Sequence, residues 1–385
     1  MNLMAIDRRQ LLIGAAVCLA STAAAAHFGT AIASAAAADD SAFDSGIMPG
    51  DLIAACRRPD GGYSVVIMSL DGTLLHEVPL EGRGHDIALD HASGRAVVFA
   101  RRPGTFALSF DIHDRKPPSV FTTPANRHFY GHGVFSRDGR LLYATEHDND
   151  TRDGLIGVYD VAGGFRRIGE FPSYGIGPHE VILLADGTTL AIANGGIETH
   201  VETGREKLNL SSMEPSLAFV DCRNGRLLAQ HKQSAELHRL SIRHLAQDAR
   251  GTVWFGCQWE GENVDSPDLV GCAGLDAPLR IIAPPKPMGA SLAGYIGSVA
   301  VSGDGRLLAA SAPRAGRIVY IDTERQQVVG ESQLADSCGV TGMEGPGFAM
   351  TSGYGIVQTE QPDHTHLTTT TFPGRAFDNH VRVIG

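Results

Sequence analysis

The sequence predicts an all-β fold, a seven-bladed β-propeller formed as one domain by residues 39–385. A histidine-led phrase recurs at a fixed interval, because His85, His132 and His179 are each 47 residues apart. Strand-like apolar runs closed by Asp-Gly turns follow these histidines, and a period in the forties with such turns is typical of propeller blades. Further copies begin at His244, at Ser298, near Gly339 and at Asn379, which gives seven in all.

The strands of each copy can be followed in order. After His132, the strand-like segments are Leu141–Thr145, Ile156–Val161 and Phe165–Phe171, separated by Gly and Asp. The copy at Asn379 has no such strands after it, whereas Leu52–Cys56, Tyr63–Leu70 and Leu74–Leu80 precede the first copy. We therefore expect the C-terminal strand to pair beside these N-terminal strands, which closes the ring and leaves no exposed sheet edge.

Residues 1–38 are predicted to be a twin-arginine export signal that is cleaved. Arg8 and Arg9 are followed by one spacer residue, by Leu11 and Leu12, and by an apolar, Ala-rich run. We expect cleavage between Ala33 and Ala38 and a periplasmic mature protein without stable membrane insertion. A retained anchor helix is the alternative.

The charge of the chain bears on its partners. The full chain carries −11, and removal of residues 1–38 takes away a net +1, which leaves about −12. An acidic chain without a basic stripe argues against nucleic acid and anionic membranes as partners. A role in binding or transporting metal cations fits the negative charge better than either of those partners.

Five cysteines remain after cleavage of the leader, and an oxidising compartment permits disulfides. Cys257 and Cys272 are 15 residues apart and flank one loop, so they are the predicted pair. The sequence contains no Cys-x-x-Cys and no Cys-x-x-Cys-His, which excludes covalent c-type haem and the common zinc spacings.

The repeated histidines are the candidate metal ligands. The innermost strand of every propeller blade lines the central channel, and five copies place a histidine at the start of that strand: His85, His132, His179, His244 and His380. Ser298 and Gly339 or Val340 occupy the other two places. Neutral imidazoles are common transition-metal ligands, so we expect a histidine ring that holds Fe or Cu at one mouth of the channel.

Loops at the same mouth supply further candidates for ligand contact. The residues are Glu146, Asn194, Glu198, Glu260 and Arg314. The two longer repeats place their extra length at Gly195–Pro215 and Trp259–Pro278, which we expect to fold over the mouth as a lid. Functional residues commonly gather in loops on one face of a rigid scaffold.

Several phrases together resemble one family. They include Gly131–Gly139 (GHGVFSRDG), Gly175–Glu180 (GIGPHE), Ala193–His200 (ANGGIETH) and Glu236–Leu245 (ELHRLSIRHL). The sequence is similar, over nearly the whole mature chain, to the exported bacterial family called domain of unknown function 1513. The resemblance implies a propeller-like fold and periplasmic metal handling, with iron as the metal, beside imelysin-like iron-uptake lipoproteins and di-haem oxidoreductases. It assigns no activity and no catalytic residues.

Two classes of function remain open. One is a periplasmic metal-binding protein, accessory to iron or copper handling, with iron-uptake proteins as partners. The other is a metal-dependent enzyme of the lactonase or hydrolase-like propeller type. Lactonase propellers hold Ca²⁺ or Mg²⁺ with oxygen ligands, whereas five imidazoles favour a softer metal, and therefore the first class. A protein-interaction platform, a polar pocket without metal and purely structural histidines are further alternatives.

Overall fold

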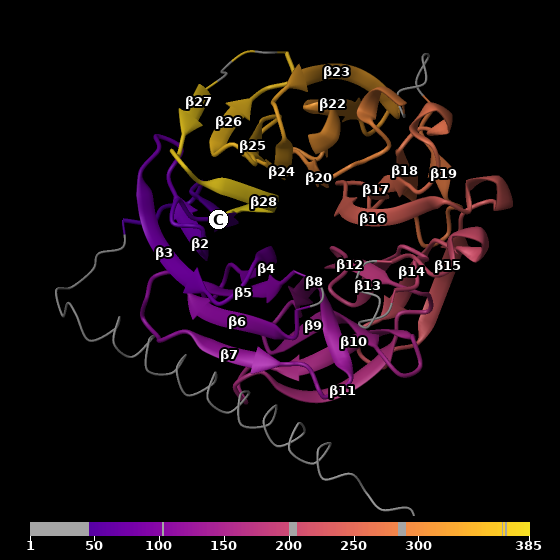
Figure 1. Ribbon diagram of the computed structural model, residues 1–385, viewed down its shortest axis with the longest axis horizontal. Coiled ribbons are helices and arrows are strands. Elements are labelled where there is room, and N and C mark those ends of the chain that lie inside the picture. Colours follow the sequence, from indigo (N-terminus) through magenta and orange to yellow (C-terminus); the bar gives the residue numbers. More distant parts are fainter. Residues whose placement is uncertain (1–45, 102–103, 200–205, 284–289, 364, 366–367) are drawn as a thin grey trace, which may run out of the picture.

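The computed structural model describes residues 46–101, 104–199, 206–283, 290–363, 365 and 368–385. These residues form seven four-stranded antiparallel sheets around a central channel, which confirms the predicted seven-bladed β-propeller (Figure 1). The predicted leader, residues 1–38, lies outside the described residues.

Six blades follow one another along the chain, each with its first strand at the channel. The first two are β4 (Gly84–Asp90), β5 (Arg95–Ala100), β6 (Phe106–Asp111), β7 (Ser119–Thr122), then β8 (Arg127–Phe135), β9 (Leu141–Asp148), β10 (Gly154–Asp160), β11 (Arg166–Pro172). The next two are β12 (Pro178–Leu183), β13 (Thr189–Asn194), β14 (Ser216–Asp221), β15 (Leu227–Lys232), then β16 (Leu240–Gln247), β17 (Val253–Trp259), β18 (Val270–Ala273), β19 (Arg280–Ile281). The last two are β20 (Ser298–Val301), β21 (Leu307–Ala312), β22 (Arg317–Asp322), β23 (Gln327–Gln333), then β24 (Ser337–Gly342), β25 (Phe348–Ser352), β26 (Ile356–Glu360), β27 (Thr368–Thr371).

The seventh blade combines strands from the two ends of the fold, as predicted. Its strands, from the channel outward, are β28 (Ala376–Val383), β1 (Leu52–Arg57), β2 (Tyr63–Met68) and β3 (Leu74–Leu80). β28 runs antiparallel to β1, with Val381 opposite Ala54. This pairing closes the ring and satisfies the backbone groups that an open edge would expose.

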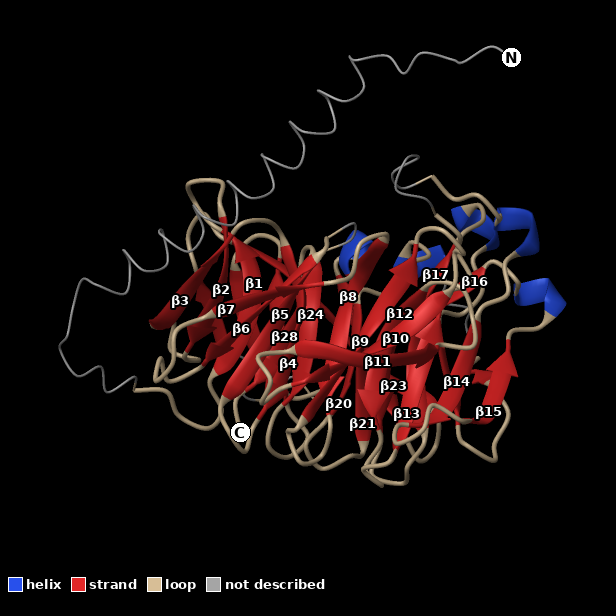
Figure 2. Ribbon diagram, turned by 90° about the horizontal axis from the view of Figure 1, so that it is seen from below, coloured by secondary structure: helices blue, strands red, loops and turns tan. Residues whose placement is uncertain are grey.

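Short 3-10 helices gather on one face of the ring, at the top of Figure 2. They are η2 (Leu210–Ser212), η3 (Ala235–Leu237), η4 (Asn263–Asp265), η5 (Ala290–Leu292) and η6 (Pro313–Ala315). η2 and η4 belong to the two insertions that the repeat lengths predict on this face. Among the described residues, no helix has the length and apolar character needed to cross a membrane.

Apolar side chains fill the space between adjacent blades and fix the inner strands in place. Phe99 of β5 and Phe129 of β8 are fully buried, and their rings pack edge to face with centroids 5.5 Å apart. Aromatic pairs in this geometry add stability beyond the area that they bury. The blades therefore present their inner strands to the channel from a rigid support.

Two inner strands without a channel histidine complete the ring. Ser298 begins β20 and is buried. Gly339 of β24 lies so near β28 that a Cβ atom there would sit 2.7 Å from the backbone nitrogen of Val381. The missing side chain thus allows β28 to pack closely against β24.

The predicted disulfide between Cys257 and Cys272 is wrong, because all five cysteines of the described chain are free and buried. Cys272 of β18 lies opposite Trp254 of β17, three residues before Cys257. Three residues span about 10 Å along a strand, whereas a disulfide needs Cα atoms within about 7 Å. The strand register, which sequence spacing does not give, separates the two thiols.

Candidate metal centre

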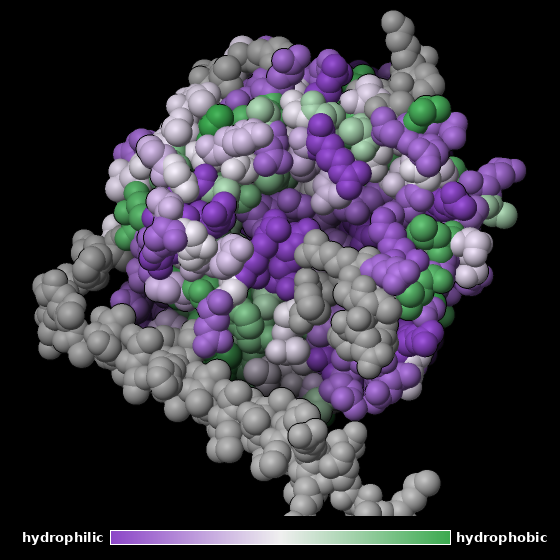
Figure 3. Space-filling view, in the orientation of Figure 1, coloured by the Kyte–Doolittle hydropathy of each residue, from purple (hydrophilic) through white to green (hydrophobic). Residues whose placement is uncertain are grey.

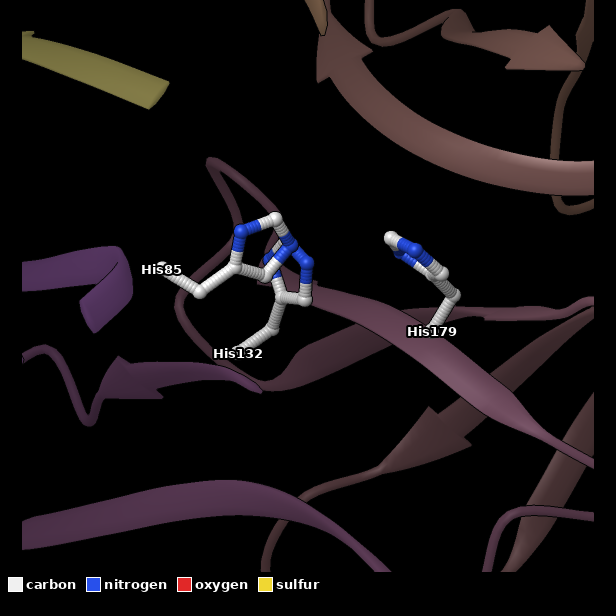
Figure 4. Close-up of side chains that lie close together, drawn as sticks. All are labelled: His85, His132 and His179. Carbon is white, nitrogen blue, oxygen red and sulfur yellow. The ribbon is translucent and has the colours of Figure 1, made fainter. Parts of the chain in front are cut away.

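Five histidines from five inner strands converge in the channel. They are His85 on β4, His132 on β8, His179 on β12, His244 on β16 and His380 on β28. Neighbouring rings have centroids 4.8 to 5.0 Å apart. Figure 4 shows three of the side chains, those of His85, His132 and His179, extending from their strands toward a common space. The structure places the histidines together, and their role as metal ligands stays a prediction.

β-bulges in the inner strands direct these side chains. The pairing of β4 with β5 shifts register where His85 lies, and that of β8 with β9 shifts where His132 lies. β12, β16 and β28 have similar irregularities beside their histidines. A bulge leaves a residue unpaired and changes the direction of the neighbouring side chains.

The expectation that each histidine begins its strand is wrong for His132, His244 and His380, because β8, β16 and β28 start four or five residues earlier.

Two of the histidines form a hydrogen bond between Nδ1 and a buried carboxylate. His132 Nδ1 lies 3.2 Å from Asp86 Oδ2, and His244 Nδ1 lies 3.2 Å from Glu180 Oε2. A neutral imidazole that donates its Nδ1–H to a carboxylate carries its lone pair on Nε2. This is the orientation and tautomer that metal-binding histidines receive from such carboxylates in proteins.

A third carboxylate holds His85 from the side of the closing blade. His85 Nδ1 lies 2.8 Å from Asp378 Oδ1. Arg83 and Arg101 also pair with Asp378, and the Arg101 Nη1 to Asp378 Oδ1 distance is 3.2 Å. Burial alone would raise the pKa of Asp378, but His85 and the two arginines hold that pKa below its ordinary value.

Several nitrogens of the cluster are buried without a hydrogen-bond partner among the residues that the structure describes. They are Nε2 of His132, His244 and His380, and Nδ1 of His179. His132, His244 and His380 are at most 2% exposed. Native proteins rarely leave buried polar atoms unpaired, and a bound ion or an ordered water commonly pairs with such atoms.

The spacing of the nitrogens suits one shared cation after a small inward movement. Potential ligand atoms of His132, His244 and His380 lie within 4.8 Å of one another, as do those of His85, His132 and His179. Imidazole nitrogens bind a metal at about 2.1 Å, so the ligands of one ion stand roughly 3–4 Å apart. Because His132 belongs to both groups, it is the centre of the cluster.

The carboxylates beside the cluster already have a cation. Asp86, His132 and Glu180 also bring ligand atoms within 4.8 Å of one another. Arg382 Nη2, however, lies 2.7 and 2.8 Å from the two oxygens of Asp86 and 3.6 Å from Glu180. The guanidinium therefore occupies both oxygens of Asp86 and offsets one of the two negative charges, which leaves the imidazole nitrogens as the ligands for a metal.

Four of the five histidines are kept neutral, which is the form that binds metals. Burial, together with Arg101, lowers the pKa of His85 to about 3, although Asp378 acts in the opposite direction. Burial also lowers the pKa of His179, of His244 and of His380. Near neutral pH the lone pairs of these imidazoles are consequently available.

Mild acid is expected to destabilise the metal-free protein. Below pH 6.5 the unfolded chain takes up a proton on His85 that the folded protein excludes until pH is about 3. The stability due to neutral His85 is thus complete above pH 6.5 and is lost as pH falls toward 3. Between about pH 7 and 5, each histidine whose folded pKa stays below 5 costs roughly 2 kcal/mol. Urea unfolding of metal-free protein over this interval, above the range where carboxylates titrate, measures the loss. A flat profile would contradict the burial of neutral imidazoles.

A cavity of about 500 Å³ opens directly above the cluster, on the face that carries the 3-10 helices. His85 and His179 belong to its lining, whereas His132, His244 and His380 lie deeper. The other lining residues are Arg101, Tyr130, Lys207, Arg243, Gln258, Trp259, Glu260, Gly261, Tyr295, Arg314 and Asn379. Figure 3 shows hydrophilic residues around the centre of this face. The histidine cluster is accordingly open on one side.

Two of the five loop candidates lie at this cavity. Glu260 and Arg314 line it. Glu146 lies elsewhere, buried against Tyr159 and Arg167 within its own blade. It belongs to β9, which continues to Asp148 where the sequence suggests a loop.

The other two loop candidates also have contacts away from the cavity. Asn194 is buried and donates to the carbonyl of Ser173 at 2.8 Å. Glu198 pairs with Arg152. The structure therefore gives no ground for ligand contact by either residue.

The cavity and the cluster include groups that the sequence reasoning missed. Asp86, Glu180 and Asp378 are missing from the predicted site, as is Lys207. Asp86 and Glu180 directly follow channel histidines, and an acidic residue after a repeated histidine was the available signal. Regular strand alternation would place such a neighbour on the opposite face, so the bulges conceal this signal.

Comparison with known proteins agrees with the geometry at the level of fold and family. No curated protein matches the chain in sequence. A chain of Kuenenia stuttgartiensis hydrazine synthase is 15% identical with a TM-score of 0.58, over 87% of this chain and 98% of that chain. The Cps50 (Swd1) β-propeller domain of Myceliophteria thermophila is 12% identical with a TM-score of 0.54, over 85% and 92%. At these identities the likeness shows the fold alone. The model of the family described as "Protein of unknown function (DUF1513)" matches residues 78–384, and the chain therefore belongs to this family.

Proposed function

We propose that this protein binds a transition-metal ion in its channel, through Nε2 of His132, His244 and His380. His85 and His179 stand between that position and the cavity. The observation that carries the proposal is the set of buried nitrogens without partners, beside carboxylates that orient the rings. Purely structural histidines would be expected to use both ring nitrogens in hydrogen bonds.

Iron or copper is the proposed metal, and the periplasm is the proposed location. Imidazole donors suit Fe and Cu, whereas Ca²⁺ and Mg²⁺ prefer oxygen ligands. The twin-arginine pattern at Arg8 and Arg9 supports export. In this proposal the protein is an accessory to metal handling, with periplasmic iron-uptake proteins as its partners.

A metal-dependent propeller enzyme is the second candidate. The cavity reaches His85 and His179, so an ion held by the deeper histidines would face a space large enough for a substrate. A metal with an open coordination position can polarise a substrate or activate water. Turnover of a lactone or ester by the metal-loaded protein would favour this candidate over a binding protein.

Metal analysis of the natively exported protein tests the proposal. We expect near-stoichiometric Fe or Cu in the wild type and its loss in the double variant His132→Ala/His179→Ala. The variant His91→Ala/His238→Ala removes two imidazoles outside the cluster and serves as the matched control. Circular dichroism checks that each variant is folded. Wild type that is metal-free and fails to bind either ion on titration would overturn the proposal.

A further inference from the structure

The cavity above the histidines is strongly cationic. Among the described residues of its lining, Arg101, Lys207, Arg243 and Arg314 carry positive charge, and Glu260 carries negative charge. The negative charge of Glu260 is shared between two cations, because its carboxylate pairs with Lys207 and lies 3.6 Å from Arg243. With neutral His85 and His179, the described lining has four positive charges and one negative charge, and Asp378 beneath it offsets part of the charge of Arg101. The lining is thus net positive, in a chain that is acidic overall.

Arg314 has the position of a ligand-binding group. Its guanidinium lies 4.5 Å from the centroid of the Tyr295 ring, and no carboxylate among the described residues forms an ion pair with it. Asn379 donates to the Tyr295 hydroxyl at 3.1 Å, which fixes the ring beneath the guanidinium. Stacking pre-orders the planar fork while its N–H groups remain available for an oxyanion.

Two other arginines flank the histidines at the floor of the cavity. Arg101 Nη1 lies 3.0 Å from Nδ1 of His85. Arg243 and His179 both line the same cavity. Negative charge brought to this floor would meet Arg101 and Arg243 together with the two imidazoles of the lining.

The electrostatics of this mouth oppose entry of a free metal cation. A hydrated Fe or Cu ion would approach a concave surface of its own sign, whereas an anion would be attracted into it. The structure thus combines imidazoles suited to a metal with an entrance suited to an anion. An anionic organic ligand that reaches the ion satisfies both parts.

The size of the cavity favours an organic anion over a single inorganic one. About 500 Å³ is available, whereas one water occupies about 30 Å³ in the liquid and metabolite-sized ligands occupy pockets of about 300–1,000 Å³. We infer that the cavity binds a small polycarboxylate, with carboxylates on Arg243 and Arg314 and one directed toward His85 and His179 as a ligand of the metal. Only that last contact rests on the proposed metal function.

Calorimetric titration of the metal-free protein with tricarballylate tests the cavity by itself. We expect binding that weakens with added salt, and no comparable binding of the neutral tricarboxamide of the same skeleton. The variant Arg243→Gln/Arg314→Gln is expected to lose roughly 100-fold in affinity, since each charge-assisted contact contributes about tenfold or more. Arg166→Gln/Arg325→Gln removes two exposed arginines elsewhere and is the matched control.

Repetition with Cu(II)-loaded protein tests contact with the metal. Tighter binding of tricarballylate and a change in the copper EPR spectrum would support direct ligation. Binding of tricarballylate by a protein that takes up no copper would overturn the proposed metal function but support anion binding in the cavity. Failure of tricarballylate to bind either form, equal binding of inorganic phosphate, or wild-type affinity in Arg243→Gln/Arg314→Gln would overturn the polycarboxylate inference.

Discussion

Protein with His132→Leu and His380→Leu is expected to be at least as stable as wild type without metal, and to gain nothing from added metal. Both histidines are buried with Nε2 unpartnered among the described residues, and an unsatisfied buried polar atom costs about 1–3 kcal/mol. Leucine has a similar size and no such atom. Asp86 keeps Arg382 at 2.7 and 2.8 Å when His132 is replaced.

Wild type should respond to metal in the opposite way. A ligand that binds only the folded state stabilises it by about 4 kcal/mol when its concentration is about 1,000 times the Kd. Urea unfolding of both proteins with and without Cu(II) or Fe(II) provides the comparison. A loss of several kcal/mol by the metal-free leucine variant would assign the histidines to the structure of the core, and an equal metal response in both proteins would place the ion elsewhere.

Asp86→Asn and Glu180→Gln are each expected to weaken metal binding by about 10- to 100-fold. The amides keep the shape of the side chains but remove the negative charge that raises the basicity of His132 and His244. The loss has a second cause, because Arg382 then keeps its positive charge near the ion with one carboxylate partner fewer. The double variant should therefore lose at least the product of the two single effects.

Competition with a chromogenic chelator measures these affinities. Asp60→Asn, which neutralises an exposed carboxylate paired with Arg58, is the control and should leave the affinity unchanged. Adding Arg382→Gln to the Asp86→Asn/Glu180→Gln double variant should restore part of the binding, since it removes the uncompensated charge. Unchanged affinity in the Glu180→Gln and Asp86→Asn variants would show that these carboxylates do not support a metal.

The sequence was sufficient for the fold because its repeat is long and regular. The interval between His85, His132 and His179 locates three inner strands, and the missing strands after His380 indicate how the ring closes. Both are consequences of chain connectivity, which spacing reports directly. The same spacing brings the histidines to the channel because every blade places its first strand there.

The contacts around the histidines depend on register, which spacing does not report. Asp86 follows His85 and would face away from the channel in a regular strand, yet the bulge in β4 leaves it 3.2 Å from His132. Glu146 lies in a strand and not in the expected loop for a related reason, since β9 extends past it and its carboxylate is buried on Arg167. One local shift of pairing thus places Asp86 beside the histidine cluster, and one unexpected strand extension places Glu146 away from it.

The closing strand has a consequence for when the centre can exist. β28 contributes Asp378, His380 and Arg382, and it is the last strand of the propeller to be synthesised. The six blades formed by β4 to β27 contain only four of the five histidines, so the cluster is complete only when β28 pairs with β1. An ion bound there would connect β28 with inner strands of other blades. This connection would form only after the ring has closed correctly. Metal uptake would then report the completion of folding as well as the presence of the ligands.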